Sequence, residues 1–191
     1  MLPALVVLAG GRAERMGGIV KGHLLRRDGR MILAAILEDL APLVSSIALV
    51  ATAEKHAQIA LPEGVLRLSD EGEGPAAALM VAAGALTAPW LLVAGADQAR
   101  ASPLAVRWLL GALRADDDAV VAEVDGRREP LLALYRRTAL LGLGEQRGGS
   151  LMRLLDALGA RALAPPPELI EAFGSVNTWV EAEAERGPQT P

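Results

Sequence analysis

The chain has 191 residues, no cysteine and a formal net charge of −4. This length predicts a single domain with a hydrophobic core, which must be largely aliphatic because only 3% of the residues are aromatic. The negative charge argues against a nucleic-acid-binding surface, and the absence of cysteine excludes disulfides, thiol catalysis and cysteine-ligated metals. Apolar stretches are too short to cross a bilayer, and the N-terminus lacks a secretory signal. We therefore expect a cytoplasmic protein without nucleic-acid or membrane partners.

Apolar runs and helical spacings alternate along the first half of the chain. Strands are expected at 5–8, 47–50, 65–68 and 90–94, and helices at 31–40, 54–60, 76–86 and 103–114. Pro75 and Pro103 stand near the starts of two of these helices, where proline is tolerated, and Ser102 is a common helix cap. Strands that alternate with helices predict right-handed βαβ units. The expected fold class is therefore α/β, a three-layer αβα sandwich around a mainly parallel sheet.

The pattern changes in the second half of the chain. Strands at 119–124 and 130–135 flank Asp125-Gly126, a pair typical of a tight hairpin turn. Helices are expected at 137–143, at 151–158 and at 179–185, with a short strand at 160–163 and a stiff proline connector at 165–167. Ser150 is the expected cap of the second of these helices. We predict one domain over residues 1–186 and a flexible tail at 187–191.

A glycine-rich run with basic residues follows the first strand. It reads Leu8-Ala9-Gly10-Gly11-Arg12 and continues through Arg15, Met16, Gly17 and Gly18 to Lys21 and Gly22. Glycines let the backbone approach a ligand closely, and successive N–H groups in such a turn attract anions. The spacing is neither the Walker nor the Rossmann pattern. Two glycines alone would indicate an ordinary turn with solvated arginines, but the whole run favours a phosphate-binding loop.

Two aspartates follow later strands. Asp97 comes just after the apolar strand at 90–94, and a carboxylate there suits Mg²⁺, which prefers oxygen ligands together with substrate phosphates. A carboxylate that caps a turn is the alternative. Asp70 follows the strand at 65–68 in an acidic loop beside Glu71 and Glu73, so a solvated acidic loop is nearly as good an interpretation.

The set of motifs resembles that of the molybdenum cofactor guanylyltransferases, the MobA-like nucleotidyltransferases. The resemblance is carried by the run from Leu8 to Gly22, by Asp70 with Gly74-Pro75, by Asp97, by the segment from Gly126 to Tyr135, and by Asn177-Thr178. It implies a nucleotide-diphospho-sugar transferase-like (Rossmann-like) fold. The related cytidylyltransferases usually show Ala-Ala-Gly where this chain has Ala9-Gly10-Gly11, so the resemblance favours the guanine-using branch.

The resemblance also implies a reaction and its residues. GMP would pass from GTP to the terminal phosphate of molybdopterin cofactor with release of pyrophosphate, in the presence of Mg²⁺. The implied catalytic residues are Arg15, Lys21 and Asp97, of which Asp97 binds the metal. The implied nucleotide-binding residues are Leu8, Ala9, Gly10, Gly11, Arg12, Lys21, Asp70 and Asp97, and the implied substrate-binding residues are Arg127, Arg128 and Asn177. Transient contacts with molybdoenzymes or cofactor-synthesis proteins are expected.

Other interpretations stay open at several positions. Arg127 and Arg128 would also fit a solvated hairpin tip, and Asn177 a helix cap. His56 is expected on a solvent-facing helix, without a catalytic role. The chain departs from the family pattern at Val20, at Ala76 to Ala78, at Ala96 and Gln98 around Asp97, and at Ser175 and Trp179. These changes leave two alternatives: a related transferase with another base or acceptor, and a non-catalytic nucleotide- or cofactor-binding accessory protein.

Overall fold

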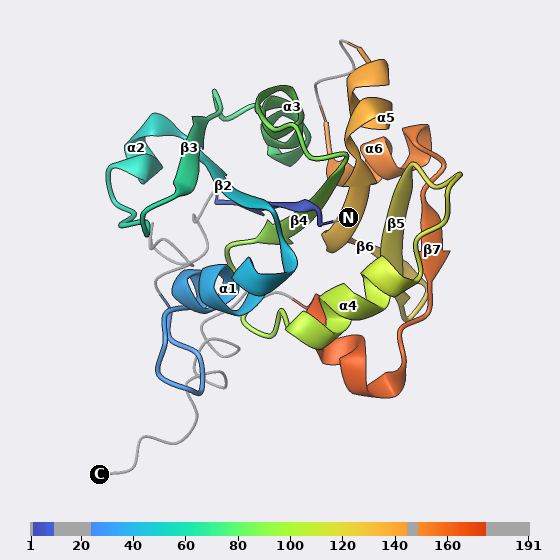
Figure 1. Cartoon of the computed structure of the whole chain (residues 1–191), viewed down its shortest axis with the longest axis horizontal. Helices are drawn as coiled ribbons and strands as arrows, with labels where there is room; N and C mark the ends of the chain where they lie inside the picture. Colours follow the sequence, from blue (N-terminus) through green and yellow to red (C-terminus); the bar gives the residue numbers. More distant parts are fainter. Residues whose placement is uncertain (1, 10–23, 145–148, 175–191) are drawn as a thin grey trace.

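A seven-stranded sheet organises the part of the chain that the computed structural model describes, residues 2–9, 24–144 and 149–174 (Figure 1). The strands are β1 (Ala4–Leu8), β2 (Ser46–Ala51), β3 (Val65–Ser69), β4 (Trp90–Gly95), β5 (Ala119–Val124), β6 (Arg127–Arg136) and β7 (Arg161–Leu163). Their order across the sheet is β3-β2-β1-β4-β6-β5-β7. Among these strands only β6 runs against its neighbours, since β4 and β5 both pair with it in antiparallel fashion and the remaining pairs are parallel.

Helices cover both faces of the sheet (Figure 1). They are α1 (Ile32–Leu40), η3 (Ala41–Leu43), α2 (Ala53–His56), α3 (Pro75–Ala85), α4 (Pro103–Gly111), α5 (Arg137–Gly142), α6 (Leu151–Ala157) and η4 (Pro167–Phe173). One hydrophobic core lies between the sheet and α1, α4 and η4, and a second lies between the sheet and α3, α5 and α6. The expected three-layer αβα sandwich with a mainly parallel sheet is confirmed.

The central strand β1 is buried on both faces. Leu5 and Val7 enter the core under α1 and α4, whereas Ala4 and Val6 enter the core under α3. A strand covered by helices on both sides reads as a continuous apolar run instead of an alternating one, which is why the sequence of β1 identified it so clearly.

Several predicted boundaries were wrong, and each error has a local cause. The helix expected at 54–60 ends at His56, because the Arg67 guanidinium binds the carbonyl oxygens of His56 and Ile59 and Ile59 is buried in the core. The helix expected to reach residue 114 ends at Gly111, after which the Asp117 carboxylate accepts a hydrogen bond from the Arg114 N–H at 2.7 Å.

Three further expectations need correction. β6 begins at Arg127, not at residue 130. The proline connector at 165–167 contains a helix start, since Pro167 is the first residue of η4. His56 does not simply face solvent: it is half-buried, and its Nε2 lies 2.8 Å from the carbonyl oxygen of Leu68 on β3.

The predicted Ser150 cap is confirmed, because its hydroxyl accepts from the Arg153 N–H. The helix expected at 179–185 and the tail at 187–191 lie outside the described residues.

An ion pair ties β7 to the chain that leads into β5, at the amino-terminal end of the strands. The Arg161 guanidinium donates to both oxygens of the buried Asp117 carboxylate, at 2.6 and 2.7 Å. Nearby, Arg136 donates to the carbonyl oxygens of Asp117 and Ala115, and its guanidinium stacks on the Trp90 ring at 4.7 Å. Arginines therefore satisfy the backbone carbonyls at this edge of the sheet.

We expect Asp117→Asn to lower the free energy of unfolding at pH 7 by about 2 kcal/mol, because it weakens charge-assisted hydrogen bonds to a buried group. The Arg161 bond holds the pKa of Asp117 below its usual value. The stabilisation is therefore fully present above the unfolded pKa of about 4 and is lost as the pH falls through the lower folded pKa. Denaturant unfolding of both proteins from pH 7 to pH 3 measures this, and a difference that persists unchanged at pH 3 would contradict it.

Candidate active site

The carboxyl ends of β1, β2, β3 and β4 meet at one edge of the sheet. Leu8 stands beside Val50 on one side and Gly95 on the other. Hydrogen bonds extend this alignment past the strands. The Ala9 N–H donates to the Val50 carbonyl oxygen at 2.9 Å, and the Ala96 N–H donates to the Leu8 carbonyl oxygen at 3.1 Å. Ligands of open α/β sheets bind at this edge. Leu8 and Ala9, two of the residues predicted to bind nucleotide, thus lie at the place where such a ligand would sit.

Asp97 follows β4 at the same edge. The chain turns tightly after Gly95, with the Gln98 N–H donating to the Gly95 carbonyl at 3.2 Å. Asp97 is half-buried. Its carboxylate lies back over the end of β4, so that a Cβ atom added to Gly95 would come within 2.8 Å of the Asp97 Oδ1. Glycine at the end of this strand leaves the space that the carboxylate occupies.

A bulge in β6 shapes the other side of this turn. Val120 of β5 pairs with Leu134 and Ala122 pairs with Glu129, so two steps along β5 correspond to five along β6. Within the bulge Leu132 has a left-handed backbone with φ of 52° although it is fully buried. Such strain is found where the surroundings enforce it, often at functional sites. The bulge places the Leu131 side chain against Gly95, where an added Cβ would lie 2.9 Å from its Cδ1.

Asp70 follows β3 at this edge, with its N–H donating to the Ala51 carbonyl at 3.2 Å. Its side chain is only 8% exposed, and its Oδ1 has no hydrogen-bond partner within the described part of the chain. Burial lowers the pKa of nearby Lys55, while the charge of Asp70 acts in the opposite direction. A buried carboxylate oxygen without a partner is costly, so a donor group supplied by a ligand would stabilise this position. This burial disfavours the interpretation of Asp70 as one of several solvated acids.

Arg127 and Arg128 begin β6, at the tip of the hairpin. Arg127 is exposed, whereas Arg128 forms an ion pair with Asp156 on α6. They occupy neighbouring positions on a strand and so point to opposite faces of the sheet. Glu129 shares the Arg127 face, and burial raises the pKa of Glu129. The two arginines therefore do not form one patch in this structure.

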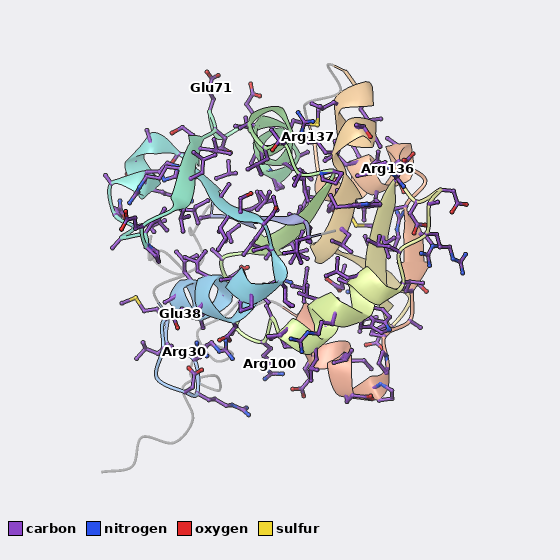
Figure 2. All side chains as sticks on the ribbon, in the orientation of Figure 1. Arg30, Glu38, Glu71, Arg100, Arg136 and Arg137 are labelled. Atoms are coloured by element: carbon purple, nitrogen blue, oxygen red, sulfur yellow. The ribbon has the colours of Figure 1, made fainter. Side chains whose placement is uncertain are left out.

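The remaining predicted site residues lie outside the described ranges. They are Gly10, Gly11, Arg12, Arg15, Lys21 and Asn177. The described chain resumes at Leu24, and there an ion-pair network fixes it to α1. Arg26 and Arg30 both bind Asp39, at 2.9 and 2.8 Å, and Arg30 also binds Glu38 (Figure 2). The segment that contains Arg26 and Arg30, a few residues after the glycine-rich run, is thus tied to α1.

The carboxylates of the described residues fit a metal that arrives with a phosphate. No group of three or more histidine, aspartate and glutamate side chains gathers anywhere in the described ranges. Mg²⁺ commonly uses one or two carboxylates and takes its other ligands from water and substrate phosphates. A single half-buried carboxylate, that of Asp97, is consistent with such a site and not with a metal cage built by the protein alone.

Sequence reasoning missed Gln98 and Gly95. Gln98 was noted only as a departure from the family pattern, yet its side chain is 0% exposed and binds the Gly95 backbone. The spacing could have indicated this contact, because the side chain of a glutamine three residues after a strand-ending glycine can accept a hydrogen bond from the glycine N–H. Leu131 was missed because the bulge that aims it at Gly95 depends on pairing between strands, which spacing along the chain does not encode.

Within the described residues, none of the helices has the length and apolar character needed to cross a membrane. A mainly parallel sheet with Asp70 and Asp97 at its carboxyl edge has the architecture of α/β proteins that bind ligands, often nucleotides, at that edge. Two solved structures share this fold. Molybdopterin-guanine dinucleotide biosynthesis protein A from Archaeoglobus fulgidus is 23% identical, with a TM-score of 0.76 over 96% of each chain. Rv0371c from Mycobacterium tuberculosis is 22% identical, with a TM-score of 0.75 over 98% of each chain, and a further structure of it is a complex with manganese.

Sequence comparison identifies the family. Residues 5–163 match the MobA-like NTP transferase domain. The molybdenum cofactor guanylyltransferase of Rhodopseudomonas palustris (strain BisB5) is 34% identical, over 95% of this chain and 91% of its own length. That of Shewanella sp. (strain MR-4) is also 34% identical, over 91% and 89%. The chain therefore belongs to the MobA-like NTP transferase family and is a nucleotidyltransferase of molybdenum cofactor biosynthesis.

We expect Gly95→Ala to reduce nucleotidyl transfer about 100-fold, because the new methyl group displaces the Asp97 carboxylate and misplacement by about 1 Å costs this much. Pyrophosphate release under saturating substrates measures the effect. Gly84→Ala in α3 is the matched control: its added Cβ meets no atom within 4 Å, so activity should be unchanged and stability should rise by up to about 1 kcal/mol. Equal activity of Gly95→Ala and the parent protein would show that the Asp97 position is not critical.

Proposed function

We propose that this protein transfers GMP from GTP to the terminal phosphate of molybdopterin cofactor and releases pyrophosphate. One observation carries the proposal: Ala9, Asp70 and Asp97 follow three strands whose carboxyl ends are aligned at one edge of the sheet. The glycine-rich run continues directly from Ala9 at that edge. The names of the relatives supply the base and the acceptor.

The residues of this chain would act by positioning and by neutralising charge. An acceptor phosphate attacks the α-phosphate of GTP, the new P–O bond forms, and the bond to the β-phosphate breaks with pyrophosphate as the leaving group. Transfers of this kind need little covalent help from the protein. Arg15 and Lys21 would neutralise phosphate charge, and Arg12 and the backbone from Leu8 to Gly11 would line the nucleotide.

Asp97 is the residue that would hold Mg²⁺. When bound, the cation would neutralise phosphate oxygens and align the attacking and leaving groups. Asp70 would bind the nucleotide, because its Oδ1, which has no partner within the described residues, can accept a hydrogen bond from a ligand. Guanine offers two adjacent N–H donors and is one chemical match for a buried carboxylate.

The acceptor side would lie at the β5–β6 hairpin. Arg127 is exposed and free to approach a phosphate from solvent. Arg128 would have to exchange its Asp156 partner for a substrate phosphate, and Asn177 would supply a side-chain amide. Transient contacts with molybdoenzymes or other cofactor-synthesis proteins would deliver the product, and the cysteine-free composition favours a cytoplasmic setting.

A nucleotide panel tests the base preference. With Mg²⁺ present, GTP at 100 times its dissociation constant stabilises the protein by about 2.7 kcal/mol, which corresponds to a rise in Tm of roughly 5–10 °C for a chain of this size. We expect smaller shifts with ATP, CTP and UTP, and a reduced GTP shift for Asp70→Asn. A larger shift with CTP would replace this proposal with the related transferase that uses another base.

Removal of a phosphate or metal partner tests the chemistry. We expect Lys21→Ala and Asp97→Asn each to lower the rate of pyrophosphate release by about 10²–10³, as loss of one positioned electrostatic partner does. Arg107→Ala on α4 provides a control that removes a charge outside the proposed site. GTP binding without pyrophosphate release for every cofactor acceptor tried would favour the non-catalytic accessory protein instead.

A further inference from the structure

We propose that Gln98 is a positioning residue that fixes the Asp97 turn in the orientation required to hold the metal. This inference rests on the proposed function and adds a residue to it. Gln98, Asp70 and Asp117 are the buried amide or charged side chains of the described residues. Both ends of the Gln98 amide are hydrogen-bonded: Oε1 accepts from the Gly95 N–H at 2.9 Å, and Nε2 donates to the Phe173 carbonyl at 3.4 Å.

The bulge in β6 leaves the Gly95 N–H without a strand partner, and Gln98 provides the acceptor. β4 and β6 pair regularly from Trp90 with Arg136 to Val93 with Ala133, and the pairing ends there. Gly95 is the next residue of β4 whose N–H would face β6, because N–H groups alternate in direction along a strand. The regular β6 ladder has ended by this point, at the left-handed backbone of Leu132. An unpaired buried N–H is costly, and the Gln98 side chain takes the place of the missing strand.

The geometry of the turn links this bond to Asp97. Gly95 and Gln98 bracket the aspartate, and they are joined twice: by the Gln98 N–H to the Gly95 carbonyl, and by the Gly95 N–H to Gln98 Oε1. The two residues between them, Ala96 and Asp97, have little freedom to rotate their backbones. The Asp97 carboxylate is consequently held against Gly95, on the side that Leu131 borders.

The second hydrogen bond anchors the turn to η4. The Phe173 ring packs edge-on against Trp108 of α4 at 5.9 Å between ring centres. A few residues along the same turn, Arg100 forms an ion pair with Glu171 of η4 at 3.1 Å (Arg100 is labelled in Figure 2). The turn from Gly95 to Gln98 is thus attached to η4, which is itself packed into the core. Gln98 supplies the buried part of this attachment.

A purely structural role predicts a different outcome from a positioning role. Gln98→Met keeps the length and volume of the side chain and removes both hydrogen bonds. If Gln98 only fills the core, the variant loses stability and retains its metal affinity. If Gln98 positions Asp97, the metal affinity falls as well, since loss of a group that orients a metal ligand typically costs about 10–100-fold in affinity.

The test measures Mn²⁺ binding to the protein–GTP complex by electron paramagnetic resonance, together with hydrogen exchange of the Gly95 amide in metal-free protein. For Gln98→Met we expect an Mn²⁺ dissociation constant about 10–100 times higher, faster Gly95 exchange, and a rate of pyrophosphate release that excess metal partly restores. Gln98→Asn, too short to reach both partners, should show intermediate values and serves if the methionine variant does not fold.

Asp117→Asn is the matched control, because it perturbs another buried polar group at the opposite end of the strands. It should lower the stability of the protein and leave the Mn²⁺ dissociation constant and the Gly95 amide exchange rate unchanged. The proposal is overturned if folded Gln98 variants show parental Mn²⁺ affinity, or if Asp117→Asn changes it equally. Absence of turnover by the parent protein would refute the proposed function alone, because metal binding and Gly95 exchange do not require turnover.

Discussion

The alignment of the parallel strands around β1 is the constraint on which the rest of the structure depends. Leu8 is flanked by Val50 and Gly95, and hydrogen bonds carry this register one residue past the strand ends. Because parallel neighbours end together, segments that are about 20 to 90 residues apart in sequence arrive at one edge. Residues 4–7 of β1 are fully buried, so any slip of this register would move every group at that edge and expose apolar side chains.

β6 brings a further segment of the chain to this edge by breaking the parallel pattern. A strand of opposite direction has its first residues, not its last, at the carboxyl edge of β4. The hairpin tip with Arg127 and Arg128 therefore reaches the same side as Asp97. The irregular geometry of β6 is concentrated in the bulge, where Leu132 takes a left-handed backbone, and the nearby Gly95 N–H is bound by Gln98 instead of by a strand partner. Strain and an unusual buried glutamine thus occur together beside Asp97.

The sequence was sufficient to predict the fold class, because apolar strand runs, helix caps and the Asp125-Gly126 turn are local signals. It also predicted that Asp70 and Asp97 follow strands of a mainly parallel sheet, and the structure places both at the same edge. It did not predict the burial of Asp70, the Gln98 bonds or the ion pair that engages Arg128, since these depend on contacts between distant segments. The premature end of α2 belongs to the same class: its cause is Arg67, on the following strand.

Tyr135 joins the two sides of the β6 bulge, because its buried hydroxyl donates to the Pro130 carbonyl oxygen at 2.7 Å. Residues 123–128 lie beyond this closure. Within the described part of the chain, their strand pairing is with one another, and Arg128 also binds Asp156 on α6. Insertions or deletions at the hairpin tip would therefore leave the pairing of β4 with β6 intact. The hairpin tip, where the acceptor side is proposed to lie, can therefore change in length without disturbing the candidate site at the carboxyl edge of β4.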